Sequence, residues 1–566
     1  MTPMAESKLE HWFLVIWLLL TTWILLCAFV IQGEYGDGYQ TIVNARYFFG
    51  DSPIFFVQRG PLAAIVLWPV EVIVQIFELD PVDVRPHHVF SGLLHSAYLF
   101  ICWLLLRRSP GTTGARLLAF GAAILCVVFY AYAPYLSHDL LPGLLFLILI
   151  FVCHRWLEQE SPADAVTLIL LGAAVTLIKQ TYATFWFALV FYAVIAYLLK
   201  WDNGRITIRK LGILTLLATA SAAISWLSYA FYVGGVIPDA PLLVRPISLI
   251  TAIAAQYGEQ LTGMFASDLY LRNLPNYGIA AMLLVIPGLI LALRGADARM
   301  RQIAVCWLIA AVIIQLVGFR EARYLAFLAP LTAMLIVPVA QSLLARQVTA
   351  MALIAVVLFD QSRGLTVAAD DLISSARIDV TRFVNAATGN GDIYSSKVLS
   401  FVYSADSPLA RDRYHGIYHL TPPNLDGLYE GRVRISTIDD PRNLGLSKIK
   451  PGDRVYYSSN TLVRRPPWNE HNLPTEMEDF IQVAGNAADI RLTLRNGMYE
   501  REDDDGSYIL FIPGPGAGQQ MPIIAGGSLS AAAADRFYGD LTDRDQLQVT
   551  AVIINVLCQA DSCRYR

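Results

Sequence analysis

The stretch WFLVIWLLLTTWILLCAFVI, residues 12–31, is 20 residues long and contains no charged side chain. An α-helix rises about 1.5 Å per residue, so a helix of this length crosses the hydrocarbon core of a bilayer, which is about 30 Å thick. The run is too long for the apolar core of a secretory signal peptide, and no clear small-residue cleavage site follows it. It predicts a first membrane-spanning helix that is retained in the protein.

The composition of the rest of the chain changes near residue 360. Of the 566 residues, 55% are hydrophobic and 16% are charged, whereas a soluble globular protein has about 25% charged residues. Residues 1–359 hold 40 of the 88 charged side chains, and residues 360–566 hold 48. This asymmetry predicts a transmembrane domain over 1–359 and a domain in water over 360–566. The net charge of −4 argues against a nucleic-acid partner, which requires a basic surface.

Apolar runs recur along residues 1–359 and, with the first, make eleven predicted transmembrane helices. They lie at 11–32, 88–106, 117–136, 141–156, 165–178, 182–199, 211–233, 277–293, 303–318, 323–344 and 348–359. A further segment, 61–77, is apolar but contains Pro61, Pro69 and Glu71. It is predicted to be an interfacial or re-entrant helix instead of a span.

The distribution of Lys and Arg predicts the orientation of these helices. With eleven spans and a cytoplasmic N-terminus, the cytoplasmic side holds 13 of these cations and the outer loops hold 8, in agreement with the positive-inside rule. Counting 61–77 as a span would instead place the basic clusters 107–116 and 200–210 outside. The sequence therefore predicts that residues 360–566 lie outside the cytoplasm.

Residues 360–566 carry the signals of a mixed α/β domain. The expected elements are a helix at 371–387, strands at 393–395 and 454–458, and a hairpin of 491–495 with 508–512. Cys558 and Cys563 can pair if this domain is in an oxidising compartment, and two free thiols are the alternative. The predicted fold class is thus an α-helical polytopic membrane protein with a C-terminal extracytoplasmic α/β domain.

The first outer loop carries two carboxylates directly after the first span. Its sequence is GEYGDGYQ, residues 33–40, with Glu34 and Asp37, and a helix-like stretch at 41–49 follows. Asp37 is predicted near the membrane–water boundary, where partial desolvation and hydrogen bonding adapt a carboxyl group to the role of a general base. The alternative, compatible with the first, is that Asp37 is the N-cap of the helix at 41–49.

Two other outer loops hold single charged side chains. Asp139 lies between two predicted spans and shortly before Pro142, so capping of the following helix is its alternative role. Lys179 is a lone cation on the outer face, and an ordinary interfacial position is the simpler interpretation of it.

Cations gather at the start of the tenth span. Arg320, Arg323 and Tyr324 precede or open it, although cations at a helix start oppose the helix macrodipole. An anionic ligand would explain their position, and interfacial snorkelling is the alternative. The planar fork of Arg binds phosphate oxygens in pairs and neutralises a phosphate leaving group, while a nearby carboxylate can take a proton from a hydroxyl. A lipid-linked phosphate substrate needs this combination.

The order of these motifs resembles the GT-C superfamily, the membrane glycosyltransferases that include protein O-mannosyltransferases and lipid A aminoarabinose transferases. The pattern GDGY at 36–39 with NARYFFG at 44–50 is similar to the first extracytoplasmic loop of that superfamily, and RGPL at 59–62 with Trp68 to its Pro-Pro-Leu juxtamembrane helix. Residues 137–142 resemble its second acidic loop, and residues 320–330 its late Arg-Tyr segment. Two departures stand out: Asp37 lacks an adjacent acidic residue, with Glu34 as the nearest, and Gly60 replaces one proline.

The resemblance, which covers about residues 30–340, implies a glycosyltransferase. An acceptor hydroxyl attacks the anomeric carbon of a polyprenyl-phosphate sugar, with inversion, on the extracytoplasmic face of a bacterial inner (plasma) membrane. The resemblance implies Asp37 as the base, with Glu34 and Asp139 as further catalytic carboxylates. The donor phosphate would be held by Arg320, Arg323, Lys179 and Tyr324. The acceptor is a glycan, glycolipid or protein. No cofactor is predicted, and a divalent metal is left open.

Two readings from other classes compete with a transferase. A polytopic transporter fits the many spans equally, but it predicts internal repeats, which the sequence does not show, and gives no role to residues 360–566. A non-catalytic envelope-assembly subunit, in which the C-terminal domain carries the function, is the second. Binding of a lipid-linked sugar followed by its transfer separates the three.

Overall fold

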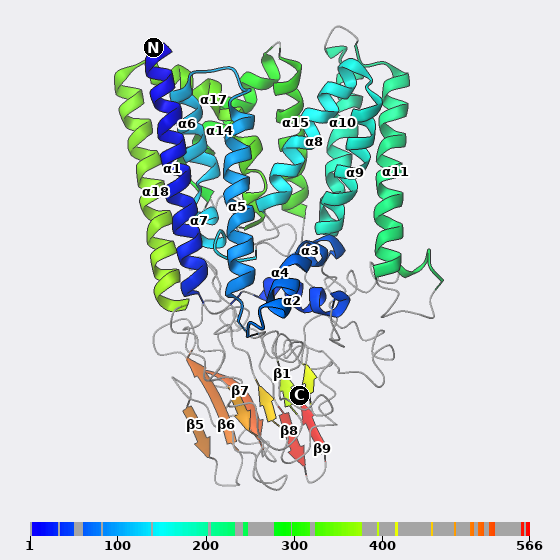
Figure 1. Cartoon of the computed structure of the whole chain (residues 1–566), viewed down its shortest axis with the longest axis vertical. Helices are drawn as coiled ribbons and strands as arrows, with labels where there is room; N and C mark the ends of the chain where they lie inside the picture. The colour runs from blue at the N-terminus through cyan, green and yellow to red at the C-terminus, as the bar shows by residue number, and fades with distance from the viewer. Residues whose placement is uncertain are drawn as a thin grey trace. The chain divides into compact units, whose positions relative to one another are not determined.

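The computed structural model of the chain divides into two compact units (Figure 1). One consists of Met1–Val30, Arg59–Val66 and His87–Leu372, and the other of Ile31–Gln58, Leu67–Pro86 and Ile373–Arg566. The structure describes residues 3–31, 34, 36–49, 60–80, 83–136, 140–201, 205–232, 241–246, 277–295, 297–316 and 323–375, together with nine short strands between 393 and 565.

The first unit is a bundle of helices, and each predicted apolar run coincides with one of its helical segments. They are α1 (Pro3–Val30), α5 (Arg85–Leu106), α6 (Thr113–Ala119) with the π-helix η1 (Phe120–Ile124) and α7 (Val127–Tyr132), α8 (Leu140–Gln159), α9 (Pro162–Ile178), α10 (Thr184–Leu198), α11 (Ile208–Tyr232), α14 (Ile279–Arg294), α15 (Ala298–Leu316), α17 (Ala329–Leu344) and α18 (Gln347–Ser375).

Successive helices run in alternate directions, so the bundle has two distinct ends (Figure 1). The Pro3 end also holds the C-terminal residues of α5, α8 and α10, and the Val30 end holds those of α1, α9 and α11. Three short helices complete the unit: α3 (Pro61–Val66), the 3₁₀ turn η2 (Gln180–Ala183) and α16 (Arg323–Ala326). The two ends matter because Lys179 and Tyr324, the candidate residues of this unit whose side chains the structure describes, lie together at one of them.

Five described helices are long and apolar enough to cross a bilayer: α1, α5, α8, α11 and α18. Large apolar side chains on their outer faces are exposed, for example Leu19 on α1 (66%), Leu216 on α11 (67%) and Leu358 on α18 (62%). Water disfavours such a surface, whereas lipid accepts it. The chain is therefore an integral membrane protein, while the number of spans stays a prediction.

The last span is longer than its hydropathy predicts. The sequence predicts its end at residue 359, but α18 continues without a break to Ser375. The continuation carries Asp360, Gln361 and Arg363, whose polarity ends the apolar run although the helix goes on. The division of the chain at residue 359 into a membrane domain and a C-terminal domain stays a prediction.

Segment 61–77 forms two short helices, α3 and α4 (Trp68–Ile76), as expected of a segment that does not cross the bilayer. The interruption at Leu67 follows from Pro69, which has no N–H to donate to a preceding turn and instead fits the first turn of α4. At about 1.5 Å per residue, neither helix spans the roughly 30 Å of hydrocarbon.

In the second unit, α2 (Gly36–Phe49) is joined to α4 by a buried ion pair. Arg46 Nε lies 3.4 Å from Glu71 Oε2, and each side chain is 6% exposed. Burial lowers the pKa of Arg46, and the Glu71 carboxylate opposes this shift, so each charge depends on the other. Removing one partner of such a pair commonly costs about 3–5 kcal/mol. The carboxylate that argued against a span is thus a structural contact.

Residues after 375 are described only as strands. β1 (Ile393–Ser395) pairs in parallel with β2 (Tyr414–Gly416) and β3 (Arg454–Tyr456), and β3 pairs antiparallel with β4 (Phe480–Gln482). β6 (Tyr508–Pro513) lies between β5 (Tyr499–Glu502) and β7 (Gln520–Gly526). β1 and β3 lie where the sequence predicts strands. The predicted hairpin partner at 491–495 is wrong, because β5 and β7 occupy both edges of β6. The predicted helix at 371–387 lies mostly outside the described residues.

The two cysteines near the C-terminus lie on the two strands of one hairpin. β8 (Val556–Gln559) and β9 (Ser562–Tyr565) pair antiparallel, and their register sets Cys558 opposite Cys563. Directly opposed residues have Cα atoms about 4.5–5.5 Å apart, within the range that a disulfide spans. The backbone is therefore compatible with the pairing, which stays a prediction.

Candidate functional site

Lys179 lies at the Val30 end of the bundle, where it caps the C-terminus of α9 in an extended conformation. Its Nζ lies 4.4 Å from the centroid of the Tyr324 ring and 5.9 Å from that of Tyr182. The side chain is half-buried. A cation over an aromatic face is attracted by the ring quadrupole, so the two tyrosines hold this ammonium group in a defined place. Of the cations predicted to bind the donor, Lys179 is the one whose side chain the structure describes.

An aromatic cluster of Phe146, Tyr182, Phe185 and Phe327 lies beside this cation. Phe146 and Phe185 stack with centroids 3.9 Å apart, and Tyr182 lies 5.1 Å from Phe185 and 5.7 Å from Phe327. These four rings come from α8, η2, α10 and the connection between α16 and α17. The cluster packs Tyr182, which faces Lys179, against Phe327 in the chain that follows Tyr324.

The start of α8 packs directly on the backbone after α16. A Cβ added at Gly143 would lie 2.3 Å from the carbonyl oxygen of Phe327, so only glycine permits this approach. The contact brings together two chain segments that carry predicted site residues. Asp139 immediately precedes α8, and Arg323 is the first residue of α16. Asp139 and Arg320 themselves lie outside the described residues.

The start of α3 meets the same region. A Cβ at Gly60 would lie 2.1 Å from the carbonyl oxygen of Leu177 and 2.3 Å from that of Ile178, the last residues of α9 before Lys179. The glycine that departs from the Pro-Pro-Leu pattern is therefore required here, because a proline ring would overlap these carbonyls. Sequence reasoning missed this requirement of the packing.

The first loop, in the second unit, brings a second carboxylate to the start of α2. A Cβ at Gly38 would lie 2.4 Å from both Cγ and Cδ of Glu34 and 2.7 Å from Oε1, so the Glu34 side chain folds over this glycine. Glu34 is fully buried, and its backbone N–H donates to the Tyr39 hydroxyl at 2.9 Å. Burial raises the pKa of Tyr39, which keeps the hydroxyl neutral. The Glu34 carboxylate thus lies against Gly38, the residue that follows Asp37 in the chain.

Asp37 occupies the second position of α2, inside its first turn. The helix begins at Gly36, so the alternative prediction of Asp37 as the N-cap of a helix at 41–49 is wrong. A carboxylate in the first turn interacts favourably with the helix dipole by about 0.3–1 kcal/mol. The catalytic roles predicted for Asp37, Glu34 and Asp139 stay predictions.

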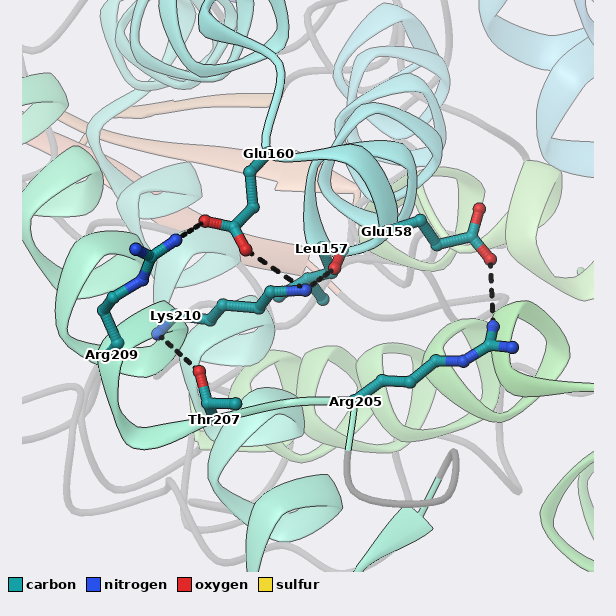
Figure 2. Close-up of a pocket in the computed structure, with 7 residues that line it drawn as sticks. All are labelled: Leu157, Glu158, Glu160, Arg205, Thr207, Arg209 and Lys210. Carbon is teal, nitrogen blue, oxygen red and sulfur yellow. Dashed lines mark hydrogen bonds and ion pairs between the residues drawn. The ribbon is translucent and has the colours of Figure 1, made fainter.

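A cavity of about 570 Å³ lies at the other end of the bundle, the Pro3 end, between the last turn of α8 and the start of α11 (Figure 2). Its charged side chains face one another. Arg209 and Lys210 both pair with Glu160, with 3.5 Å between Lys210 Nζ and Glu160 Oε1, and the guanidinium group of Arg205 lies 3.9 Å from the Glu158 carboxylate. The ion pairs link α8 to α11, and the cavity is separate from the Lys179 region. Within the described residues, no three His, Cys, Asp or Glu side chains are grouped as metal ligands.

No protein-family model and no curated protein matches the sequence. Solved structures do match, at the level of the fold, which confirms the predicted resemblance to the lipid A aminoarabinose transferases as a likeness of fold. The particular structures are those of ArnT from Cupriavidus metallidurans. The complex of that protein with undecaprenyl phosphate matches with a TM-score of 0.52 at 12% identity, over 80% of this chain and 96% of that chain. The apo structure matches with a TM-score of 0.50 at 12% identity, over 81% and 97%. At this identity the likeness establishes the fold.

Proposed function

We propose that this protein is a glycosyltransferase that moves a sugar from a polyprenyl-phosphate donor to a hydroxyl of a cell-envelope glycan, glycolipid or protein. The observation that carries the proposal is the ammonium group of Lys179, held by Tyr324 at the end of the bundle where α8 and α16 begin. A fixed cation beside lipid-facing helices suits the phosphate of a membrane-embedded donor. The fold shared with ArnT, a protein crystallised with undecaprenyl phosphate, supports the same substrate class.

The proposed reaction is a single displacement. The acceptor hydroxyl attacks the anomeric carbon as the bond from that carbon to the phosphate oxygen breaks, so the configuration inverts. The hydroxyl proton passes to the Asp37 carboxylate, and the polyprenyl phosphate departs with the electron pair of the broken bond. Lys179, Arg320 and Arg323 neutralise the charge that develops on this phosphate. Glu34 and Asp139 are the further carboxylates assigned to the site.

Replacement of Lys179 by Ala is expected to weaken donor binding at least tenfold. A hydrogen bond to a charged group contributes about 1.5–3 kcal/mol, and 1.4 kcal/mol corresponds to a factor of ten. Tyr324→Leu keeps the ammonium group but removes the cation–π contact, so a smaller loss is expected. Binding of a radiolabelled polyprenyl-phosphate sugar to the protein in nanodiscs measures both.

Lys200→Ala is the matched control for this measurement, because Lys200 follows α10 at the Pro3 end. Donor affinity should be unchanged in the control. Unaltered affinity in a folded Lys179→Ala protein would remove this residue from the donor site.

The proposal places the N-terminus in the cytoplasm, the C-terminal domain outside it and the chain in a bacterial inner membrane. A reporter enzyme that is active only outside the cytoplasm should therefore be active when fused after Arg566. The expectation rests on the odd number of predicted spans and on the excess of Lys and Arg in the inner loops. Activity of a cytoplasm-only reporter at the same position would reverse the topology and, with it, the face on which the transfer is proposed.

A further inference from the structure

The chain leaves helical geometry between η1 and α7, in the middle of the bundle. Leu125 ends η1 with φ −88° and ψ 46°, and Cys126 is extended at φ −71° and ψ 164°. Carbonyl groups before such a break lose the amide donors one turn ahead that a continuous helix provides. In a bilayer, water does not replace them, so another part of the protein must donate to these oxygens.

Gln361 of α18 supplies the donors. Its Nε2 donates to the carbonyl oxygens of Gly121 and Leu125, each at 2.8 Å, and its Oε1 accepts from the Tyr130 hydroxyl at 2.7 Å. One side chain therefore bonds to η1, to the break and to α7. A glutamine amide is suited to this, because it carries two donors and an acceptor on one planar group.

Gly364 and Asp360, two residues of α18 near Gln361, also make contacts with other helices of the bundle. A Cβ at Gly364 would lie 2.3 Å from the Tyr130 ring, so the ring of Tyr130 in α7 packs directly on the backbone of α18. Asp360, which is 1% exposed, accepts from the backbone N–H of Ala280 at 2.9 Å and thereby caps the start of α14. α18 is thus joined to two helix ends inside the bundle through adjacent polar residues.

The broken helix leads to a residue of the proposed site. After α7, the backbone of Ala133 and Tyr135 is fixed by α5: His95 Nδ1 lies 2.7 Å from the carbonyl oxygen of Ala133, and Ser91 Oγ donates to that of Tyr135 at 2.8 Å. Asp139 follows four residues later and precedes α8. The position from which this loop departs is therefore set by bonds to α5 on one side and by Gln361 on the other.

We propose that Gln361 is a positioning residue that fixes the η1–α7 break and the backbone from the break to Leu136, after which the chain continues to Asp139. The role of Asp139 rests on the proposed function, whereas the effect of Gln361 on the 125–136 backbone does not. Leu in place of Gln361 removes all three hydrogen bonds, and Glu keeps the shape but cannot donate to the two carbonyls. Ser362→Ala is the matched control, because Ser362 is exposed and its hydroxyl donates to the carbonyl oxygen of Phe359 within the same helix.

The experiment compares wild type, Gln361→Leu, Gln361→Glu and Ser362→Ala, each as the full chain in nanodiscs. Amide hydrogen exchange over residues 125–136 should rise in both Gln361 variants, with little change in α9 and η2, and not in the control. In transfer from a radiolabelled polyprenyl-phosphate sugar, kcat should fall about 10²-fold, as expected of a misplacement of about 1 Å, while the KM for the donor stays within about twofold. In an Asp139→Asn background, Gln361→Leu should add no further loss.

Unchanged exchange over 125–136 in a folded Gln361 variant would overturn the proposal, as would an equal rise in all helices. If Gln361→Leu does not fold, Tyr130→Phe removes one of the same bonds and should give a smaller rise over the same residues; its absence would also overturn the proposal. A further loss of activity in the Asp139→Asn background would contradict the part of the proposal in which Gln361 acts on transfer through Asp139. If the wild type transfers no sugar, the proposed function fails, and the exchange measurement still decides the role of Gln361.

Discussion

Asp37→Asn is expected to reduce the rate of sugar transfer by about 10²–10⁴, the loss typical of removing a general base, while donor binding and folding persist. Asn retains the shape of the side chain but cannot take the proton of the acceptor hydroxyl. Asp37 lies in the first turn of α2, so loss of its interaction with the helix dipole costs only about 0.3–1 kcal/mol of stability. The catalytic and the structural roles therefore predict different outcomes, and kcat measured beside the thermal unfolding midpoint separates them.

Asp83→Asn serves as the control for this substitution. Asp83 pairs with Arg85 at the surface, where ion pairs contribute about 0–1 kcal/mol, so neither turnover nor stability should change much. Glu34→Gln tests the neighbouring carboxylate that folds over Gly38. Normal turnover in Asp37→Asn, combined with an inactive Glu34→Gln or Asp139→Asn protein, would move the base to another residue.

Replacing Arg320 or Arg323 by Ala is expected to weaken donor binding by tenfold or more, and replacing both should weaken it further. Each guanidinium group is assigned a charged hydrogen bond to the phosphate, worth about 1.5–3 kcal/mol. Lys at either position should restore only part of the affinity, because it lacks the planar fork that binds two oxygens. Titration with a labelled polyprenyl-phosphate sugar measures the loss.

Arg205→Ala provides the comparison for the arginine variants, since Arg205 belongs to the ion-pair network at the Pro3 end. Its donor affinity should equal that of the wild type. A folded Arg320→Ala, Arg323→Ala double variant with wild-type affinity would show that these two arginines do not bind the phosphate.

Hydropathy was sufficient to predict the helical segments but not the extent of the last one. A polar residue lowers the local hydropathy whether it faces water or a neighbouring helix. Asp360 and Gln361 were therefore read as the end of a span, although both bond to other helices inside the bundle. The strand paired with β6 is also misassigned, because residues 491–495 (RLTLR) show the apolar–polar alternation of a strand, whereas Tyr499–Glu502 (YERE), the strand that pairs with β6, is mostly charged.

The site depends on contacts between residues far apart in the chain, which no local pattern reports. Lys179 was the weakest of the predicted cations, yet Tyr324, 145 residues later, gives it a fixed position. Gly60 is a departure from the family pattern with no explanation in the sequence, whereas in the structure the carbonyls of Leu177 and Ile178 exclude any side chain there. Motif order predicts which loops carry the chemistry, and packing determines how the described residues beside those loops are held.

The most direct test is transfer by the purified full-length protein in lipid nanodiscs, supplied with a panel of polyprenyl-phosphate sugars labelled in the sugar and with envelope glycans, glycolipids and proteins as acceptors. The label should leave the lipid and appear on a hydroxyl of one acceptor with inverted anomeric configuration, at a rate that Asp37→Asn lowers by at least about 10²-fold. Movement of an intact labelled lipid or solute across the membrane, or binding without transfer for every donor and acceptor tested, would contradict the assignment of a glycosyltransferase.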